Sequence, residues 1–184
     1  HATLTRISRS GPMTIVAFEV EMRSGAEPVH TMETVFGFFP AAALASQAGI
    51  TDEAPPPLPA PTIVEPLART GRLGLLDRVV ARTERRIVCE MDVEAGAWFF
   101  QAHFFTDPVQ PGSLGLQLIA DAFALLGAPL DLCAPHTWKY RGQVRPHNQL
   151  VTVDATVDGD HLVAHLWVDG ACIYRFSGRR AVLN

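Results

Sequence analysis

The sequence has few cysteines, and its apolar runs are short. Its 184 residues include three cysteines, Cys89, Cys133 and Cys172, with no Cys-x-x-Cys spacing. Such wide spacing suggests neither a disulfide framework nor a zinc site, so a cytoplasmic location is expected. No apolar run is long enough to cross a bilayer, and no membrane segment is predicted.

Positive charge is also sparse. Fifteen Lys and Arg residues stand against nineteen Asp and Glu residues, which gives a net charge of -4. The arginine pairs at 85–86 and 179–180 are isolated and form no basic stripe, so a nucleic-acid partner is not expected. A composition of 48% hydrophobic and 18% charged residues is typical of a globular chain.

A proline-rich stretch divides the chain. Residues 52–61, DEAPPPLPAP, hold five of the fourteen prolines, and such a segment is expected to be an extended connector without a core of its own. We therefore predict three parts, an amino-terminal unit over residues 1–50, a linker over 51–61 and a carboxy-terminal domain over 62–184.

A three-strand pattern occurs twice. Residues 2–23 alternate like a hairpin and 29–39 like a third strand, with a short helix over 40–49; the end of the chain repeats the strands at 150–157, 161–168 and 172–183. The second copy is preceded by a helix and further strands, but the first is not. Together with the opening on His1, this predicts a piece of a longer polypeptide whose first unit is represented only by its closing strands. Residues 1–39 should pack onto another element, because an isolated meander is marginally stable.

The segment from Ala97 to Leu126 carries the candidate chemistry. Its aromatic residues 98–105 predict a strand that ends near His103, and Pro108 and Pro111 then break the ladder. Dense apolar residues after Gly112 predict a buried helix. His103 would precede the start of that helix, whose free N–H groups and dipole favour a developing negative charge. A base at this place suits proton abstraction next to a carbonyl, although a lone histidine among phenylalanines can also be a plain core residue.

The run WFFQAHFFTDPVQPGSLGL, residues 98–116, resembles the active-site signature of the hotdog-fold β-hydroxyacyl-acyl-carrier-protein dehydratases. It is nearest to the 3-hydroxydecanoyl type and its relatives in polyunsaturated-fatty-acid synthases. Residues 75–80 and 138–144 resemble two further segments of that family. The resemblance implies an α+β hotdog fold, an antiparallel sheet wrapped around a central helix, within a double hotdog. It also implies elimination of water from a 3-hydroxyacyl thioester.

The resemblance assigns roles to individual residues. His103 would be the base and the Gly112 N–H the oxyanion donor. Residues around them would contact the acyl chain, namely Phe104, Pro111, Ser113 and Leu116. The substrate would arrive on the phosphopantetheine of an acyl-carrier protein, with no other cofactor. No metal is expected, since His161 and His165 lack a third ligand.

The acid is where this sequence departs from the family. The family carries Asp or Glu fourteen residues after the histidine and Gln four residues later, whereas here these positions hold Gln117 and Asp121. Either Asp121 is the acid, about 6 Å further along the helix, or a partner helix supplies it through a pseudo-dimer or homodimer of central helices. We favour the partner helix.

Two other functions are compatible with the sequence. Gln117 in the acid position would suit a non-catalytic hotdog that binds acyl-carrier protein, and an acyl thioesterase would use the same fold. Asp107 is interpreted as a structural turn residue. Lys139, Arg141 and Arg145 are expected to alternate along one strand face, either solvated or facing the carrier protein.

Overall fold

The structure is a computed structural model that describes residues 1–45, 49–58 and 63–181. Its contacts divide the chain into two compact units, His1–Gln47 and Ala48–Asn184. The proline-rich stretch thus falls within the second unit. Each unit is described by itself below.

The first unit is an antiparallel meander. It consists of β1 (Ala2–Ser10), β2 (Met13–Ser24) and β3 (Glu27–Phe38) in the order β1-β2-β3, as predicted. Gly11 and Gly25 provide the positive φ angles of the two turns. A short helix, α1 (Ala41–Ala45), follows; the rest of the helix predicted over 40–49 includes residues 46–48, which lie outside the described part.

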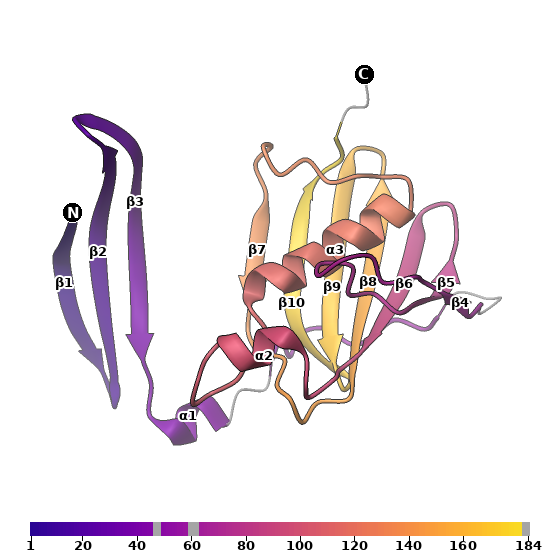
Figure 1. Cartoon of the computed structure of the whole chain (residues 1–184), viewed down its shortest axis with the longest axis horizontal. Helices are drawn as coiled ribbons and strands as arrows, with labels where there is room; N and C mark the ends of the chain where they lie inside the picture. Colours follow the sequence, from indigo (N-terminus) through magenta and orange to yellow (C-terminus); the bar gives the residue numbers. More distant parts are fainter. Residues whose placement is uncertain (46–48, 59–62, 182–184) are drawn as a thin grey trace. The chain divides into compact units, whose positions relative to one another are not determined.

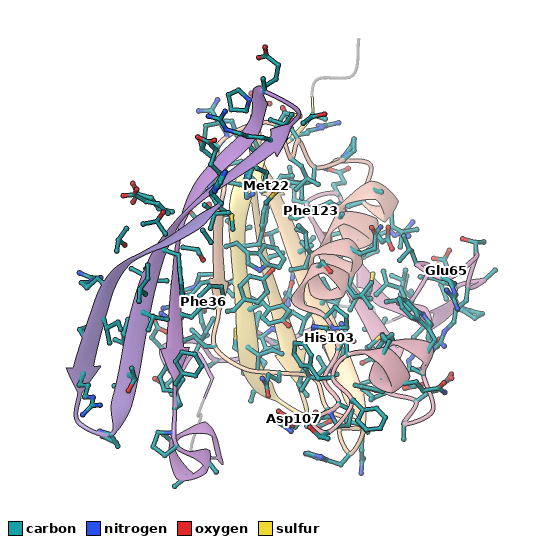
Figure 2. The ribbon with its side chains drawn as sticks, turned by 60° about the vertical axis from the view of Figure 1, so that its left-hand side comes forward. Met22, Phe36, Glu65, His103, Asp107 and Phe123 are labelled. Atoms are coloured by element: carbon teal, nitrogen blue, oxygen red, sulfur yellow. The ribbon has the colours of Figure 1, made fainter. Side chains whose placement is uncertain are left out.

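One face of this meander is apolar. The register places Phe18 opposite Leu4 and Thr34, and Val20 opposite Met32, while Glu19 opposes Glu33 on the other face. Phe18 and Phe36 meet edge to face on the apolar side, with ring centroids 6.1 Å apart. Large exposed side chains continue this face on all three strands (Figure 2), namely Leu4, Ile7, Met22, Met32, Phe36 and Phe38. That residues 1–39 pack onto another element stays a prediction.

The second unit is a seven-stranded antiparallel sheet. Its order is β4-β5-β6-β8-β9-β10-β7, and β7 therefore forms one edge. The strands are β4 (Glu65–Pro66), β5 (Arg78–Arg82), β6 (Arg86–Asp92), β7 (Thr137–Tyr140), β8 (Leu150–Asp158), β9 (His161–Val168) and β10 (Ala171–Arg179). A single long helix, α3 (Gly112–Leu125), lies across one face of this sheet (Figure 1).

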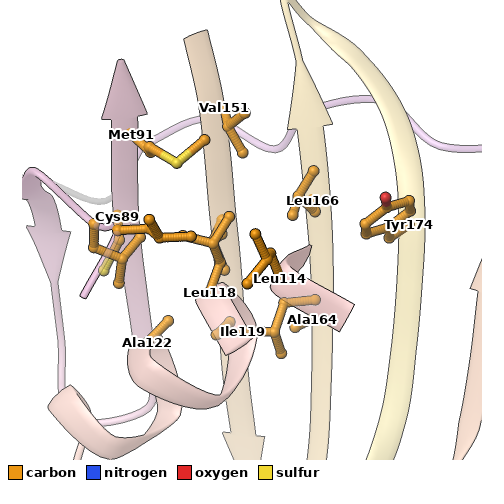
Figure 3. Packing of buried hydrophobic residues seen from close by; sticks show 14 of the residues in the cluster. Cys89, Met91, Leu114, Leu118, Ile119, Ala122, Val151, Ala164, Leu166 and Tyr174 are labelled. Atoms are coloured by element: carbon orange, nitrogen blue, oxygen red, sulfur yellow. The ribbon is translucent and has the colours of Figure 1, made fainter. Parts of the chain in front are cut away.

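The core lies between α3 and the sheet. Five apolar side chains of α3 point onto strands β6, β8, β9 and β10 (Figure 3), namely Leu114, Leu118, Ile119, Ala122 and Phe123. Gly115 allows the close approach, because a Cβ there would overlap the Tyr174 ring. Gly127, with φ of 76°, ends the helix: its N–H donates to Ala124 O and the Ala128 N–H donates to Phe123 O. The predicted buried helix is confirmed.

The aromatic strand predicted over residues 98–105 is wrong. Residues Trp98–Ala102 form a short helix, α2, and His103 is its carboxy-terminal cap. The adjacent Phe99 and Phe100 are both buried, with ring centroids 4.6 Å apart. Neighbouring side chains of a strand would point to opposite faces, so burial of both in one core favours the helix over the β propensity of the aromatic residues.

The strand predicted over 137–145 is too long. β7 ends at Tyr140, so Lys139 lies on the strand while Arg141 and Arg145 follow it, and the three do not share one strand face. The strand predicted to reach residue 183 ends at Arg179, and residues 182–184 lie outside the described part.

Residues 50–57, the outer segment, lie against the sheet face opposite α3. Alternation along β9 places Leu162, Ala164 and Leu166 in the core beside α3 and His165 on the other side. Hydrogen bonds attach the outer segment to the sheet: Ile50 N–H to Cys172 O at 2.7 Å, Arg175 to Asp52 and Glu53, and Arg86 Nη1 to Pro57 O at 2.9 Å. These proline-rich residues are thus held on the domain.

Candidate functional site

His103 is held in one orientation at the end of α2 (Figure 2). Its Nδ1 lies 3.0 Å from the carbonyl oxygen of Val109, and the Val109 N–H donates to the His103 carbonyl at 2.8 Å. A carbonyl can only accept, so Nδ1 carries the proton and Nε2 presents a lone pair. The ring also stacks on Phe104, with centroids 4.0 Å apart. This half-buried imidazole is oriented as a base at Nε2.

The start of α3 follows directly. Pro111 is the amino-terminal cap and Gly112 the first helical residue. Among the described residues the Gly112 N–H has no hydrogen-bond acceptor, as expected for the first turn of a helix. This N–H and the positive end of the helix dipole suit a developing oxyanion.

Gly112 also lies under an aromatic ring. A Cβ at this position would be 2.9 Å from Cε1 of Tyr140, and the Tyr140 hydroxyl donates weakly to Gly112 O at 3.5 Å. Burial raises the pKa of Tyr140 to about 12, so its hydroxyl keeps its proton at neutral pH. A side chain at position 112 would have to displace the ring.

Gln117 and Asp121 form a pair one turn apart on α3. Gln117 Nε2 donates to Asp121 Oδ1 at 2.7 Å. Burial raises the pKa of Asp121 above its ordinary value, against the opposing effect of that hydrogen bond. The pair is the polar part of a groove of about 520 Å³ whose other walls are mainly apolar, formed by Leu67, Ala68, Thr70, Leu73, Gly74, Leu76, Ala124 and Leu125.

The chain does not bring these two groups of residues together. His103 and Gly112 are not among the residues that line the groove of Gln117 and Asp121. Within the described part, the single side-chain hydrogen bond of His103 is the one to Val109. The structure therefore holds two half-sites, one with a base and a free helix N–H, the other with an amide and a carboxyl group.

The residues predicted to contact the acyl chain are dispersed around the start of α3. Phe104 is 58% exposed, Ser113 is exposed, and Pro111 and Leu116 are half-buried. Ser113 is the second residue of α3, not its cap. None of these four lines the groove beside Gln117.

Three features of the site were not found by sequence reasoning. The Val109 carbonyl is a backbone group, which no residue pattern reveals. The ion pair between Asp107 and Arg145, at 2.7 Å, joins residues that are far apart in the chain. Gln110 is 3% exposed, and neither polar atom of its side chain has a partner in the described structure. The signal for Gln110 was available, since it is the one polar residue between Pro108 and Pro111.

The described residues contain no group of three or more His, Cys, Asp and Glu side chains placed to hold a metal ion. No helix in that part of the chain has the length and apolar character needed to span a membrane.

An antiparallel sheet wrapped around one buried helix, with an oriented histidine before the helix start, defines a hotdog domain of the dehydratase type. Residues 67–177 match the family described as FabA-like domain, and the chain belongs to this family. The predicted hotdog fold and the predicted resemblance are both confirmed.

One curated relative belongs to the polyunsaturated fatty acid synthase of Thraustochytrium sp., as one of its subunits. It is 28% identical over 116 residues, and the match covers 48% of this chain and 7% of that protein. The chain thus corresponds to a small part of the length of this relative.

Solved structures also resemble the chain. The dehydratase heterocomplex ApeI:P from Xenorhabdus doucetiae has a TM-score of 0.50 at 12% identity, covering 59% of this chain and 97% of that chain. A bifunctional dehydratase-cyclase domain in ambruticin biosynthesis has a TM-score of 0.43 at 13% identity, covering 98% and 66%. The first likeness agrees with the hotdog fold.

Proposed function

We propose that this domain eliminates water from a 3-hydroxyacyl thioester to give a trans-2-enoyl thioester. The observation that carries the proposal is the hydrogen bond from His103 Nδ1 to Val109 O, just before the free N–H of Gly112, in a chain of the FabA-like family. An oriented base and an oxyanion donor are what abstraction of an α-proton from a thioester requires.

The proposed reaction balances with these groups and one acid. His103 Nε2 takes the proton from C2, and the Gly112 N–H stabilises the negative charge on the thioester oxygen. The electron pair then forms the C2–C3 double bond while the C3–O bond breaks. The departing hydroxyl takes a proton from an acid and leaves as water.

We assign the acid to the helix of a second hotdog unit. His103 has no carboxyl partner among the described residues, whereas Gln117 and Asp121 lie in a different groove. An assembly of two hotdogs through their central helices would place a carboxyl group from one unit beside the histidine of the other. The in-chain alternative, with Asp121 as the acid for His103, requires contacts that this chain does not make by itself.

The proposed substrate carrier is the phosphopantetheine arm of an acyl-carrier protein. The support is family membership and the relative from a polyunsaturated fatty acid synthase, a large protein of which this chain matches 7%. No residue of this chain is assigned to the carrier.

The test is hydration of an enoyl thioester, the reverse reaction, with a chain extended to include a second hotdog unit. Wild type should hydrate crotonyl-pantetheine, and His103→Ala should lower the rate by roughly 10²–10⁴ with an unfolding midpoint near that of wild type. His136→Ala is the control, because that exposed imidazole bonds only the Ala134 carbonyl. Equal activity of the His103 variant and wild type would reject His103 as the base.

A non-catalytic carrier-binding module is the second candidate, and Gln117 in the usual acid position favours it. Its signature would be binding of acylated carrier protein by a folded, extended chain without turnover.

A further inference from the structure

The loop that carries His103, residues 103–111, has little apolar burial at its tip. Phe104 is 58% exposed and Phe105 is 95% exposed. Within the loop, Val109 N–H donates to His103 O at 2.8 Å and Phe104 N–H donates to Asp107 O at 3.3 Å. Something outside the loop must limit its motion if the imidazole is to keep one position.

Two hydrogen bonds join the loop to the segment after β7. The Gln110 N–H donates to Val144 O at 2.9 Å, next to the start of α3. At the tip, Arg145 Nη1 donates to Asp107 Oδ1 at 2.7 Å. The second bond is the side-chain link that reaches the exposed part of the loop.

Arg145 is itself held on both sides. Its Nη2 donates to Gln143 Oε1 at 2.6 Å, and its backbone N–H donates to Asn148 Oδ1 at 2.6 Å. The Asn148 N–H returns a bond to Arg145 O at 3.0 Å. The guanidinium is thus presented by a closed turn, with little side-chain freedom left to lose on pairing with Asp107.

The turn is anchored to the sheet through one aspartate. Asn148 Nδ2 donates to Asp169 Oδ2 at 2.9 Å, and the N–H groups of Gln149 and Leu150 donate to Asp169 Oδ1. Burial alone would raise the pKa of Asp169, but these hydrogen bonds outweigh it and lower the pKa. Asp169 lies in the turn between β9 and β10, so the chain of bonds leads from a rigid hairpin to the loop tip.

We propose that Arg145 is a positioning residue, which acts through Asp107 to fix the loop that presents His103. The inference rests on the proposed function, because it concerns the geometry of the base. It also changes the interpretation of both residues: Asp107 is more than a turn former, and Arg145 faces the catalytic loop instead of forming a solvated strand face. An exposed ion pair contributes little to folding, but displacement of a catalytic group by about 1 Å can cost up to ~10²-fold in rate.

The experiment compares Arg145→Ala, Arg145→Lys and Asp107→Asn with Arg85→Ala. Arg85 forms an ion pair of the same kind with Asp158, at 2.9 Å and more exposed, far from the loop in the chain. Arg145→Ala and Asp107→Asn should each lower kcat roughly tenfold with KM nearly unchanged. Arg145→Lys keeps one donor and should lie between. Arg85→Ala should match wild type, and the unfolding midpoints of all four should be similar.

Amide hydrogen exchange gives a readout that does not depend on activity. Residues 104–110 should exchange faster in Arg145→Ala than in wild type or Arg85→Ala. An inactive wild type would reject the proposed function, while this exchange would still decide whether the link holds the loop. Equal exchange and equal kcat in Arg145→Ala and Arg85→Ala would overturn the inference, as would a change confined to KM, which would make Arg145 a substrate or carrier contact.

Discussion

The side-chain amide of Gln117 donates a 2.7 Å hydrogen bond to the carboxyl group of Asp121 one turn further along α3. The donor hydrogen occupies Oδ1 and leaves Oδ2 as the free oxygen of Asp121. The exchanged order of acid and amide therefore keeps the contact between the two groups, but it moves the carboxyl group about 6 Å along the helix axis.

Replacement of this pair tests the source of the acid for His103. If the acid comes from a second hotdog, Asp121→Asn should leave hydration of an enoyl thioester within about threefold of wild type, because the substitution preserves shape and the hydrogen bond from Gln117. Gln117→Asp should then also retain activity at the His103 site. A loss of ~10²–10⁴ in Asp121→Asn would identify Asp121 as the acid and reject the partner-helix assignment.

The raised pKa of Asp121 predicts a pH-dependent cost to stability. The folded protein binds this proton more tightly than the unfolded chain does, so the carboxyl group makes the fold less stable as the pH rises above its ordinary value of 3.8. Asp121→Asn should exceed wild type in free energy of unfolding at neutral pH, and this advantage should shrink as the pH falls toward about 4. Urea unfolding of both proteins across this range measures the difference.

The control for that series is Asp160→Asn, a change at an exposed position between β8 and β9. An Asp121→Asn advantage that grows as the pH falls would contradict the direction of the shift.

Gln110 predicts a stabilising substitution. Its buried amide lacks partners in the described structure, and an unsatisfied buried polar group costs about 1–3 kcal/mol. Gln110→Met has nearly the same length and no polar atoms to satisfy, so it should raise the free energy of unfolding by roughly this amount. Chemical denaturation measures it, with the exposed Gln149→Met as control. A destabilised Gln110→Met would show that the amide has a partner in the folded protein.

Periodicity and turn chemistry were enough to predict most strands of both units and the helix α3. Gly127 ended that helix as expected, through a backbone conformation that favours glycine. The aromatic residues before His103 were misassigned because β propensity measures packing on a sheet, and at Phe99 and Phe100 the packing partner is a helix and its core.

The candidate site was predictable only in part. The motif located His103 and Gly112, since these depend on local order along the chain. The hydrogen bond to Val109 O and the ion pair between Asp107 and Arg145 depend on how distant backbone segments meet, which periodicity does not encode. The same holds for the separation of His103 from the groove of Asp121.

The outer segment has a spectroscopic consequence. Trp167 lies on the sheet face opposite α3, yet it is 4% exposed because Ile50 and Cys172 cluster with it. The other two tryptophans are Trp98, partly exposed beside the Arg72 guanidinium, and Trp138 on β7. Release of residues 50–57 from the sheet would hydrate the Trp167 indole while the α3 core stays closed. The protein thus carries an intrinsic fluorophore that reports on this segment separately from the core.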